Sequence, residues 1–376
     1  MIYELLYPLS TQFGWARVLN VLRYVPFRII MATLTAMLLC FLLAPWFIRR
    51  LQSKQIGQVI RKDGPQSHHI KAGTPTMGGA LILLAVLVST MLWADVHNVF
   101  VMATAGVTAG YGVIGYLDDR LKIVAKNSRG LPGRYKILGQ VGVGGLGLAY
   151  TFIDFGNLPA EWLSIRTRLS IPFLAFSKYP IDLPLWVYLA FALFVLVAFS
   201  NGVNLTDGLD GLAIGPVMIN AGTYLVWSYV AGLVLFGRPL AQYLDIAGTP
   251  QMGELSVFAA AVIGAGMGFL WYNTYPAQVF MGDVGSLSLG GGLGMLAILT
   301  KNELLSVLIG GIFVLETASV VTQVFSYKVF GKRVFLMAPI HHHYEKKGWA
   351  EPKIIVRFWI ISILLALIGL SSLKLR

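Results

Sequence analysis

Long apolar runs separated by short polar segments dominate the sequence. A helix needs about 20 mostly apolar residues to cross a bilayer, and about ten runs come close to that length. The expected spans are residues 25–48, 77–96, 98–117, 137–153, 184–199, 212–235, 255–273, 286–300, 303–327 and 355–373. The pattern therefore predicts an all-α integral membrane protein in which residues 1–376 form a single polytopic membrane domain.

Composition agrees with a membrane protein. The chain is 56% hydrophobic and only 12% charged, whereas a soluble domain carries about 25% charged residues. Its net charge of +12 would suggest a nucleic-acid partner for a soluble protein. Here the excess of positive residues that accompanies cytoplasmic loops explains the charge, so we expect membrane lipid and no nucleic acid as a partner.

The positive residues also predict sidedness. An even number of spans places both termini on one side, and the loops after the odd-numbered spans on the other. Three of those loops, 49–76, 118–136 and 328–354, hold 18 of the 29 Lys and Arg residues. These loops, together with 200–211 and 274–285, are therefore expected to be cytoplasmic and both termini periplasmic. The longest periplasmic segment is then 154–183.

Two local patterns predict structure rather than chemistry. Gly264 and Gly268, in the seventh run, have the small-residue spacing that lets helices pack closely in lipid. Within the periplasmic segment, residues 164–170 could form a small hairpin.

Polar clusters gather at the predicted cytoplasmic face. Ionisable groups at the edge of hydrocarbon are expensive, so they are candidates for function. The clusters contain Lys71 and Thr76; Asp118, Asp119 and Lys122; Asn204, Asp207, Gly208, Leu209 and Asp210; Phe280 and Asp283; and His341, His342 and His343. A solvated helix end is the alternative interpretation of the paired aspartates, with Lys122 as an ion-pair partner.

The oxygen-rich clusters suit a hard cation. Mg²⁺ takes one or two carboxylates, keeps several waters and shares substrate phosphates, and Asp118, Asp119 and Asp283 can supply such ligands. Zinc held by the three histidines is a weaker interpretation, because adjacent side chains on a regular element point apart and no cysteine lies nearby. Gly282 and Gly285 flank Asp283 and leave the backbone open to an anion.

Together these features indicate phosphoryl transfer at a membrane surface, with one reactant from the cytosol and the other in lipid. Phe280 or Tyr275 could stack on a nucleobase, although packing or anchoring at the interface is as common a role for such a ring. Glu316 and Gln323 lie seven residues apart in the ninth run, so they share a helix face that should look into the bundle.

The clusters resemble those of the polyprenyl-phosphate N-acetylhexosamine-1-phosphate transferase superfamily, and within it most closely the phospho-N-acetylmuramoyl-pentapeptide-transferase family. The resemblance covers residues from about 25 to 373. It rests on KAGTPTMGG at 71–79, the aspartate pair at 118–119, NLTDGLDGLA at 204–213, FMGDVGS at 280–286 and APIHHHYE at 338–345. The last motif differs from the histidine pattern of relatives that use UDP-N-acetylglucosamine.

The resemblance implies a Mg²⁺-dependent enzyme of the bacterial inner membrane. Its reaction would join UDP-N-acetylmuramoyl-pentapeptide to undecaprenyl phosphate, giving lipid I and UMP, and the family suggests a homodimer. Asp283 would bind Mg²⁺, and Asp118, Asp119, Asp283 and His341 would be catalytic. The substrate-binding positions would be Lys71, Thr76, Lys122, Asn204, Asp207, Gly208, Leu209, Asp210, Phe280, Gln323, His342 and His343.

Two forms of this reaction remain open. In one step, Asp118 takes a proton from the lipid phosphate, whose oxygen attacks the sugar-linked phosphorus; in two steps, an aspartate attacks first and a covalent intermediate forms. We favour one step, because a phosphate with a second pKa near 6 is already mostly ionised at neutral pH. For the same reason, Asp118 could instead position Mg²⁺ or the lipid phosphate.

Two other functions compete with this hypothesis. A polyprenyl-phosphate N-acetylglucosamine-1-phosphate transferase would use the same chemistry on another sugar, and the histidine motif argues against it. A transporter or flippase would place ionisable residues near mid-membrane, whereas the aspartates here cluster at one boundary.

Overall fold

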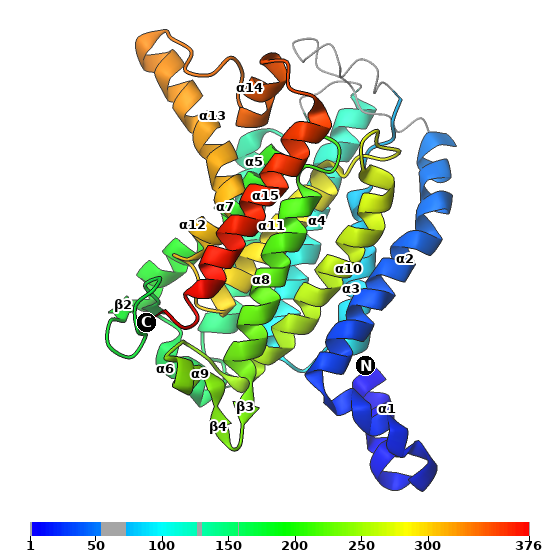
Figure 1. Cartoon of the computed structure of the whole chain (residues 1–376), viewed down its shortest axis with the longest axis vertical. Helices are drawn as coiled ribbons and strands as arrows, with labels where there is room; N and C mark the ends of the chain where they lie inside the picture. The colour runs from blue at the N-terminus through cyan, green and yellow to red at the C-terminus, as the bar shows by residue number, and fades with distance from the viewer. Residues whose placement is uncertain (1, 54–72, 126–129, 157, 376) are drawn as a thin grey trace.

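The computed structural model describes residues 2–53, 73–125, 130–156 and 158–375. Long helices packed side by side make up the body of the molecule (Figure 1). They are α2 (Val25–Ser53), α3 (Gly79–Trp93), α4 (Val99–Val124), α5 (Gly133–Phe152), α7 (Leu185–Thr206), α8 (Ile214–Gly232), α10 (Leu255–Asn273), α11 (Gly282–Leu299), α13 (Gly311–Phe330) and α15 (Glu351–Ser371). Each predicted span thus has a helical counterpart.

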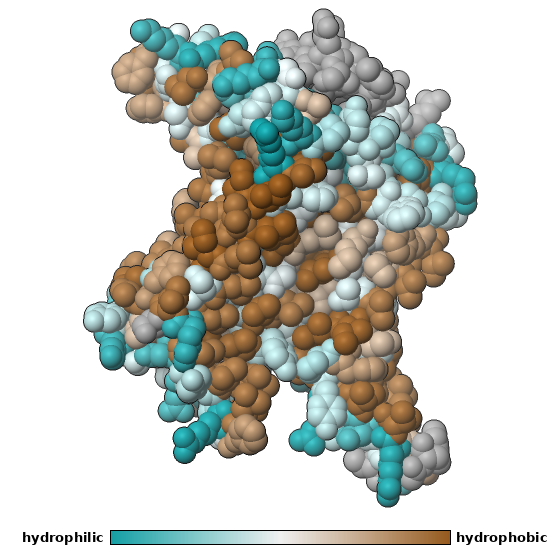
Figure 2. Space-filling model, in the orientation of Figure 1, coloured by the Kyte–Doolittle hydropathy of each residue, from teal (hydrophilic) through white to brown (hydrophobic). Residues whose placement is uncertain are grey.

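Length and composition support the membrane assignment. In the described part of the chain, six helical segments are long and apolar enough to cross a bilayer: Val25–Ser53, Val99–Val124, Leu185–Thr206, Pro250–Asn273, Gly282–Leu299 and Glu351–Ser371. Figure 2 shows apolar side chains over the middle of the molecule and hydrophilic side chains gathered at its two ends. The class of all-α membrane protein is confirmed, because such a belt matches the hydrocarbon layer.

Short elements lie at the helix ends. They are α1 (Ile2–Gln12), η1 (Gly14–Arg23), α6 (Ala160–Ile165), α9 (Leu240–Leu244), η3 (Pro250–Glu254), α12 (Ser306–Ile309) and α14 (Ile340–Lys346). Two small antiparallel pairs complete the fold: β1 (Arg168–Leu169) with β2 (Ile181–Asp182), and β3 (Val234–Leu235) with β4 (Arg238–Pro239). The expected hairpin within residues 164–170 is wrong, because β1 pairs with a strand more than ten residues further along the chain.

Several helices extend beyond the apolar runs. α4 continues to Val124, α7 to Thr206, and α11 already begins at Gly282. Hydropathy marks the limits of the hydrocarbon layer, whereas backbone hydrogen bonds continue a helix into the polar boundary. Many polar residues expected in loops therefore lie on helix ends, where their direction is set.

Helix α11 occupies the centre of the bundle, and every residue from Val284 to Leu299 is buried. Glycine contacts allow its neighbours to come close: a Cβ on Gly79 in α3 would overlap the backbone of Gly285, and a Cβ on Gly115 in α4 would overlap the carbonyl of Asp283. The first turn of α11 is therefore held directly against α3 and α4.

The predicted close packing of the seventh run is also confirmed. A Cβ on Gly264 would overlap the carbonyl oxygen of Thr33 in α2, and a Cβ on Gly268 would lie 2.6 Å from Cβ of Cys40. Packing is thus the role of this glycine pair, as expected for small residues between helices in lipid.

Candidate active site

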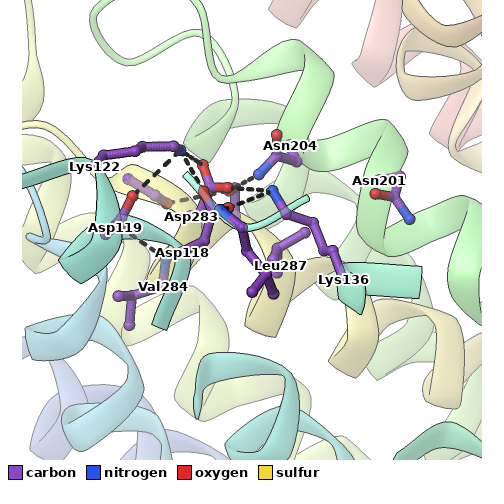
Figure 3. Close-up of polar contacts among 12 residues, drawn as sticks. Asp118, Asp119, Lys122, Lys136, Asn201, Asn204, Asp283, Val284 and Leu287 are labelled. Atoms are coloured by element: carbon purple, nitrogen blue, oxygen red, sulfur yellow. Dashed lines mark hydrogen bonds and ion pairs between the residues drawn. The ribbon is translucent and has the colours of Figure 1, made fainter. Parts of the chain in front are cut away.

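Three carboxylates meet at one end of the bundle (Figure 3). Asp118 and Asp119 come from the end of α4, and Asp283 from the first turn of α11. One ligand oxygen from each lies within 4.8 Å of the others. Asp118 and Asp119 are buried and Asp283 is half-buried, so the three negative charges are concentrated at a site with little water.

Two lysines partly compensate these charges. The Nζ atom of Lys122 lies 2.5 Å from Asp118, 3.1 Å from Asp283 and 3.6 Å from Asp119. The Nζ atom of Lys136, from the first turns of α5, lies 2.7 Å from Asp283 and 3.4 Å from Asp118. Three carboxylates against two ammonium groups leave the ionised cluster with a net negative charge.

Backbone groups set the direction of the carboxylates. Leu131 N–H donates to Asp118 Oδ1 at 2.8 Å, and Val284 N–H donates to Asp119 Oδ2 at 3.2 Å. Gly282 has a φ of +73°, which favours glycine, and a Cβ there would lie 2.6 Å from Asp119 Oδ2. The turn into α11 therefore needs glycine both for its backbone and for the close approach of Asp119.

The cluster fits a hard divalent cation. Its donors are all carboxylate oxygens, drawn from two helices that are packed in direct contact, and Mg²⁺ prefers such oxygen ligands. A dication would also more than offset the excess negative charge. Asp283, Asp118 and Asp119 are the residues that could hold it.

The end of α7 and the segment between α7 and α8 lie against the same cluster. Asn204 Nδ2 donates to Ser286 Oγ on α11 at 3.1 Å. Asp210 Oδ2 accepts from Ala277 N–H at 2.9 Å, and Asp210 N–H donates to Glu351 at 3.0 Å. Leu209 is buried in a small apolar cluster beside α15. The segment is therefore tied to α11, to the 274–281 connection and to α15.

Asp207 lies just beyond the last turn of α7, among these carboxylates. Burial, followed by the negative charges of Asp283, Asp119 and Asp210, raises its pKa to about 8, while a hydrogen bond from the backbone of Gly282 acts in the opposite direction. Asp207 is thus a carboxyl group that takes up a proton near neutral pH.

The three histidines lie on one short helix but face different partners. The Nδ1 atom of buried His341 is 3.0 Å from Glu316 Oε1 on α13. That of His342 is 2.6 Å from Glu345 Oε2, and that of His343 accepts from Leu336 N–H at 3.1 Å. The pKa of His343 is lowered by desolvation and by the neighbouring Lys347. The rings of His341 and His342 pack against each other, with centroids 4.1 Å apart, while the three Nδ1 atoms contact three different groups.

His341 lies directly against the α7–α8 segment. A Cβ on Gly208 would overlap Nε2 of His341, so glycine is required there for close approach. This Nε2 is buried and has no hydrogen-bond partner among the described residues. A polar ring atom in that state is ready to bond to a ligand.

The remaining sequence-predicted residues have varied surroundings. Thr76 is buried, and its Oγ1 would lie 3.0 Å from a Cβ on Gly282. Phe280 is half-buried, and its N–H donates to Pro75 O at 2.8 Å. Lys71 lies outside the described residues.

Gln323 bonds to the backbone that follows α13. Its amide oxygen accepts from the N–H groups of Val334 and Phe335 at 3.0 and 2.9 Å, and its Nε2 donates to Phe335 O at 3.0 Å. It therefore holds the segment that follows α13. The same residue lines a cavity of about 550 Å³, with Lys328, Arg333 and Lys346 among the other lining residues.

Sequence reasoning missed two residues that contact the candidate site, Lys136 and Glu351. Lys136 was counted only as a positive loop residue, and Glu351 was not singled out. Nothing in their local sequence sets them apart, since Lys136 lies 18 residues from Asp118 and Glu351 lies 141 residues from Asp210. Glu316 carried a usable signal, because an acidic residue inside an apolar run is rare.

Comparisons with known proteins match much or all of this chain. The model described as Glycosyl transferase family 4 matches residues 101–301, and phospho-N-acetylmuramoyl-pentapeptide-transferase signature 1 matches residues 71–83. Three similar proteins carry the name phospho-N-acetylmuramoyl-pentapeptide-transferase, from Sorangium cellulosum (71% identical), Anaeromyxobacter sp. strain Fw109-5 (55%) and Pelobacter propionicus (53%). Each match covers the full length of both chains.

Proposed function

Because the chain belongs to the phospho-N-acetylmuramoyl-pentapeptide-transferase family, we propose that it performs the reaction of that family. It transfers phospho-N-acetylmuramoyl-pentapeptide from UDP-N-acetylmuramoyl-pentapeptide to undecaprenyl phosphate, giving lipid I and UMP. It is a phosphoglycosyl transferase of peptidoglycan synthesis and a multi-pass protein of the bacterial inner membrane.

The carboxylate–lysine cluster of Asp118, Asp119, Asp283, Lys122 and Lys136 carries the proposal at the level of the site. It lies at one end of a bundle with an apolar belt (Figures 1 and 2). A water-soluble nucleotide sugar and a polyprenyl phosphate anchored in lipid can meet only at such a boundary. Phosphoryl transfer needs positive charge and fixed geometry around the phosphates. The two lysines, and a cation held by the carboxylates, would supply the positive charge at fixed positions.

Magnesium is the proposed cofactor, held by Asp283 with Asp118 or Asp119. When bound there, it would neutralise the charge that develops on the diphosphate of the nucleotide sugar. Lys122 and Lys136 would orient the phosphate oxygens, since both ammonium groups already lie among the same carboxylates.

The nucleotide is proposed to lie along the α7–α8 segment. Asn204, Asp207, Gly208, Leu209 and Asp210 would contact uridine, with the half-buried ring of Phe280 as a stacking surface. Lys71, Thr76, Gln323, His342 and His343 are the further proposed substrate contacts. His341 is proposed to bond to substrate through Nε2, because that atom is buried without a partner among the described residues.

The one-step reaction is the proposed mechanism. Asp118 would accept or orient the proton of undecaprenyl phosphate, whose oxygen attacks the sugar-linked phosphorus while UMP leaves. Asp118 is already bonded by Leu131 N–H and by Lys122. These contacts favour a positioning role over a nucleophilic one, because a carboxylate neutralised by two donors attacks poorly.

The membrane arrangement is part of the proposal. Ten spans, both termini in the periplasm, the site on the cytoplasmic face and a homodimer all follow the family. The structure agrees in one respect, since α1 and the end of α15 lie at the end of the bundle away from the site (Figure 1).

Release of UMP from UDP-N-acetylmuramoyl-pentapeptide by purified protein tests the proposal. The assay needs undecaprenyl phosphate, with and without Mg²⁺, with Asp283→Asn in parallel. Release that requires lipid and metal and is lost in the variant would support it. Release without lipid phosphate would favour the two-step reaction, and release with UDP-N-acetylglucosamine alone would move the protein to the sister branch. If neither UDP-sugar gives UMP release, the result would favour a transporter or flippase.

A further inference from the structure

A buried set of hydrogen bonds joins four helices beneath the active site. Its centre is Gln140 on α5, whose side chain is fully buried. Gln140 Nε2 donates to Ser200 Oγ at 2.9 Å, and Asn201 Nδ2 donates to Gln140 Oε1 at 2.9 Å. Both partners lie on α7.

Two further bonds extend this set to the other helices. Ser200 Oγ donates to the carbonyl of Leu287 on α11 at 3.0 Å. The hydroxyl of Tyr111 on α4 donates to the backbone carbonyl of Gln140 at 2.9 Å. We call these five residues the Gln140 junction. Figure 3 shows Leu287 beneath the charged cluster and Asn201 to one side of it.

Every helix of the Gln140 junction also carries an active-site residue. Lys136 on α5 precedes Gln140 by four residues, Asn204 on α7 follows Ser200 by four, and Asp283 on α11 precedes Leu287 by four. On α4, Asp118 follows Tyr111 by seven. Such spacings put each pair on one helix face, with the junction about 6–10 Å deeper in the bundle at 1.5 Å per residue.

Apolar and glycine contacts hold these helices together, and the Gln140 junction adds directional contacts to them. The packing faces are apolar or glycine-rich; for example, a Cβ on Gly290 would lie 2.6 Å from Cα of Ser200. Apolar contacts are not directional, whereas a buried amide loses stability unless both its donor and its acceptor are bonded. The described bonds satisfy both groups of the Gln140 amide at one relative position of the helices.

We propose that Gln140, with Ser200, is a positioning residue for the transfer reaction: the Gln140 junction sets the register of α4, α5, α7 and α11 and so places Asp118, Lys136, Asn204 and Asp283. This inference rests on the proposed function for its kinetic consequence. It assigns no contact with substrate to Gln140 itself.

The test uses the full-length protein with Gln140→Leu, Ser200→Ala and the double variant. Asn220→Leu is the matched control, because Asn220 is an equally buried amide that donates to Pro216 O within its own helix α8. UMP release gives kcat and KM, Mn²⁺ binding by electron paramagnetic resonance reports the carboxylate cluster, and a thermal melt in detergent reports folding.

Each single variant is expected to lower kcat about tenfold or more, since displacement of a reacting group by a fraction of an ångström is costly. Mn²⁺ binding should weaken as well, and Asn220→Leu should leave kcat and Mn²⁺ binding unchanged. The double variant should lose little more than either single variant, because both changes interrupt the same set of bonds.

Lower melting temperatures with kcat and Mn²⁺ binding unchanged in the folded fraction would overturn the proposal, as would losses that multiply in the double variant. If Gln140→Leu does not fold, Ser200→Ala removes only one oxygen atom and keeps the question open to measurement. Wild-type protein without UMP release would contradict the proposed reaction, while the Mn²⁺ measurement would still decide whether the junction places the carboxylates.

Discussion

The Nδ1 atom of His341 lies 3.0 Å from Oε1 of Glu316, and both side chains are buried. The contact joins α14 to α13 across 25 residues of sequence. Because one ring nitrogen is engaged by the carboxylate, the other, Nε2, is directed at Gly208 in the segment that follows α7. Glu316 thereby sets the orientation of a candidate catalytic ring.

Replacement of Glu316 should therefore reduce activity without removing the histidine. In Glu316→Gln the side-chain shape is kept but the negative charge that orients the ring is lost, so kcat/KM should fall about tenfold or more. UMP release is the measurement. Glu345→Gln, which alters the partner of His342 instead, is the comparison. Full activity in Glu316→Gln would mean that Glu316 contributes to packing and does not orient His341.

Addition of one methyl group at Gly208 should displace His341. A Cβ there overlaps His341 Nε2, and overpacking typically costs about 1–3 kcal/mol. Gly208→Ala should lose most activity and melt at a lower temperature than wild type. Gly142→Ala on α5 is the control, since a Cβ at Gly142 meets nothing within 4 Å. Equal activity of the two variants would contradict the observed contact.

Loss of Lys136 should have opposite effects on catalysis and on cation binding. Lys136→Gln removes an ammonium group 2.7 Å from Asp283, so a phosphate-orienting charge disappears and kcat should fall about 10²-fold. The carboxylate cluster becomes more negative, so its affinity for Mn²⁺ should rise. Asp283→Asn should weaken Mn²⁺ binding instead. Unchanged activity in Lys136→Gln would exclude Lys136 from the reaction.

The raised pKa of Asp207 predicts a pH dependence of stability. Its pKa is about 8 in the folded protein against a reference value of 3.8. Between these values the folded protein holds a proton that the unfolded chain has lost, so stability falls as the pH rises from about 4 towards 8.

Asp207→Asn removes that titration, and its melting temperature should therefore decline less than that of wild type between pH 5 and pH 8. Thermal melts in detergent across this range measure the difference. Asp154→Asn is the control, because Asp154 follows the end of α5 that lies away from Lys136 and the site. Parallel curves for wild type and Asp207→Asn would show that Asp207 is ionised throughout.

Much of the site was predictable, because costly charged residues in an apolar chain stand out. The run pattern placed Asp118 and Asp119 near the end of one span and Asp283 near the start of another, and sidedness suggested that they meet. Their contact within 4.8 Å depends on helix ends that run past the apolar residues, and on glycine contacts at Gly79 and Gly115. The pattern of hydropathy along the sequence predicts neither the helix ends nor the glycine contacts.

The sequence by itself determined the membrane class, the kinds of side chain at the site and the family, because each depends on local composition or on short motifs. Only the tertiary structure decided which distant groups act together: Lys136 with Asp283, Glu316 with His341 beside Gly208, and Gln140 with Ser200. Those pairings depend on helix register, which arises from contacts between segments far apart in the chain, such as the bond from Gln140 to Ser200.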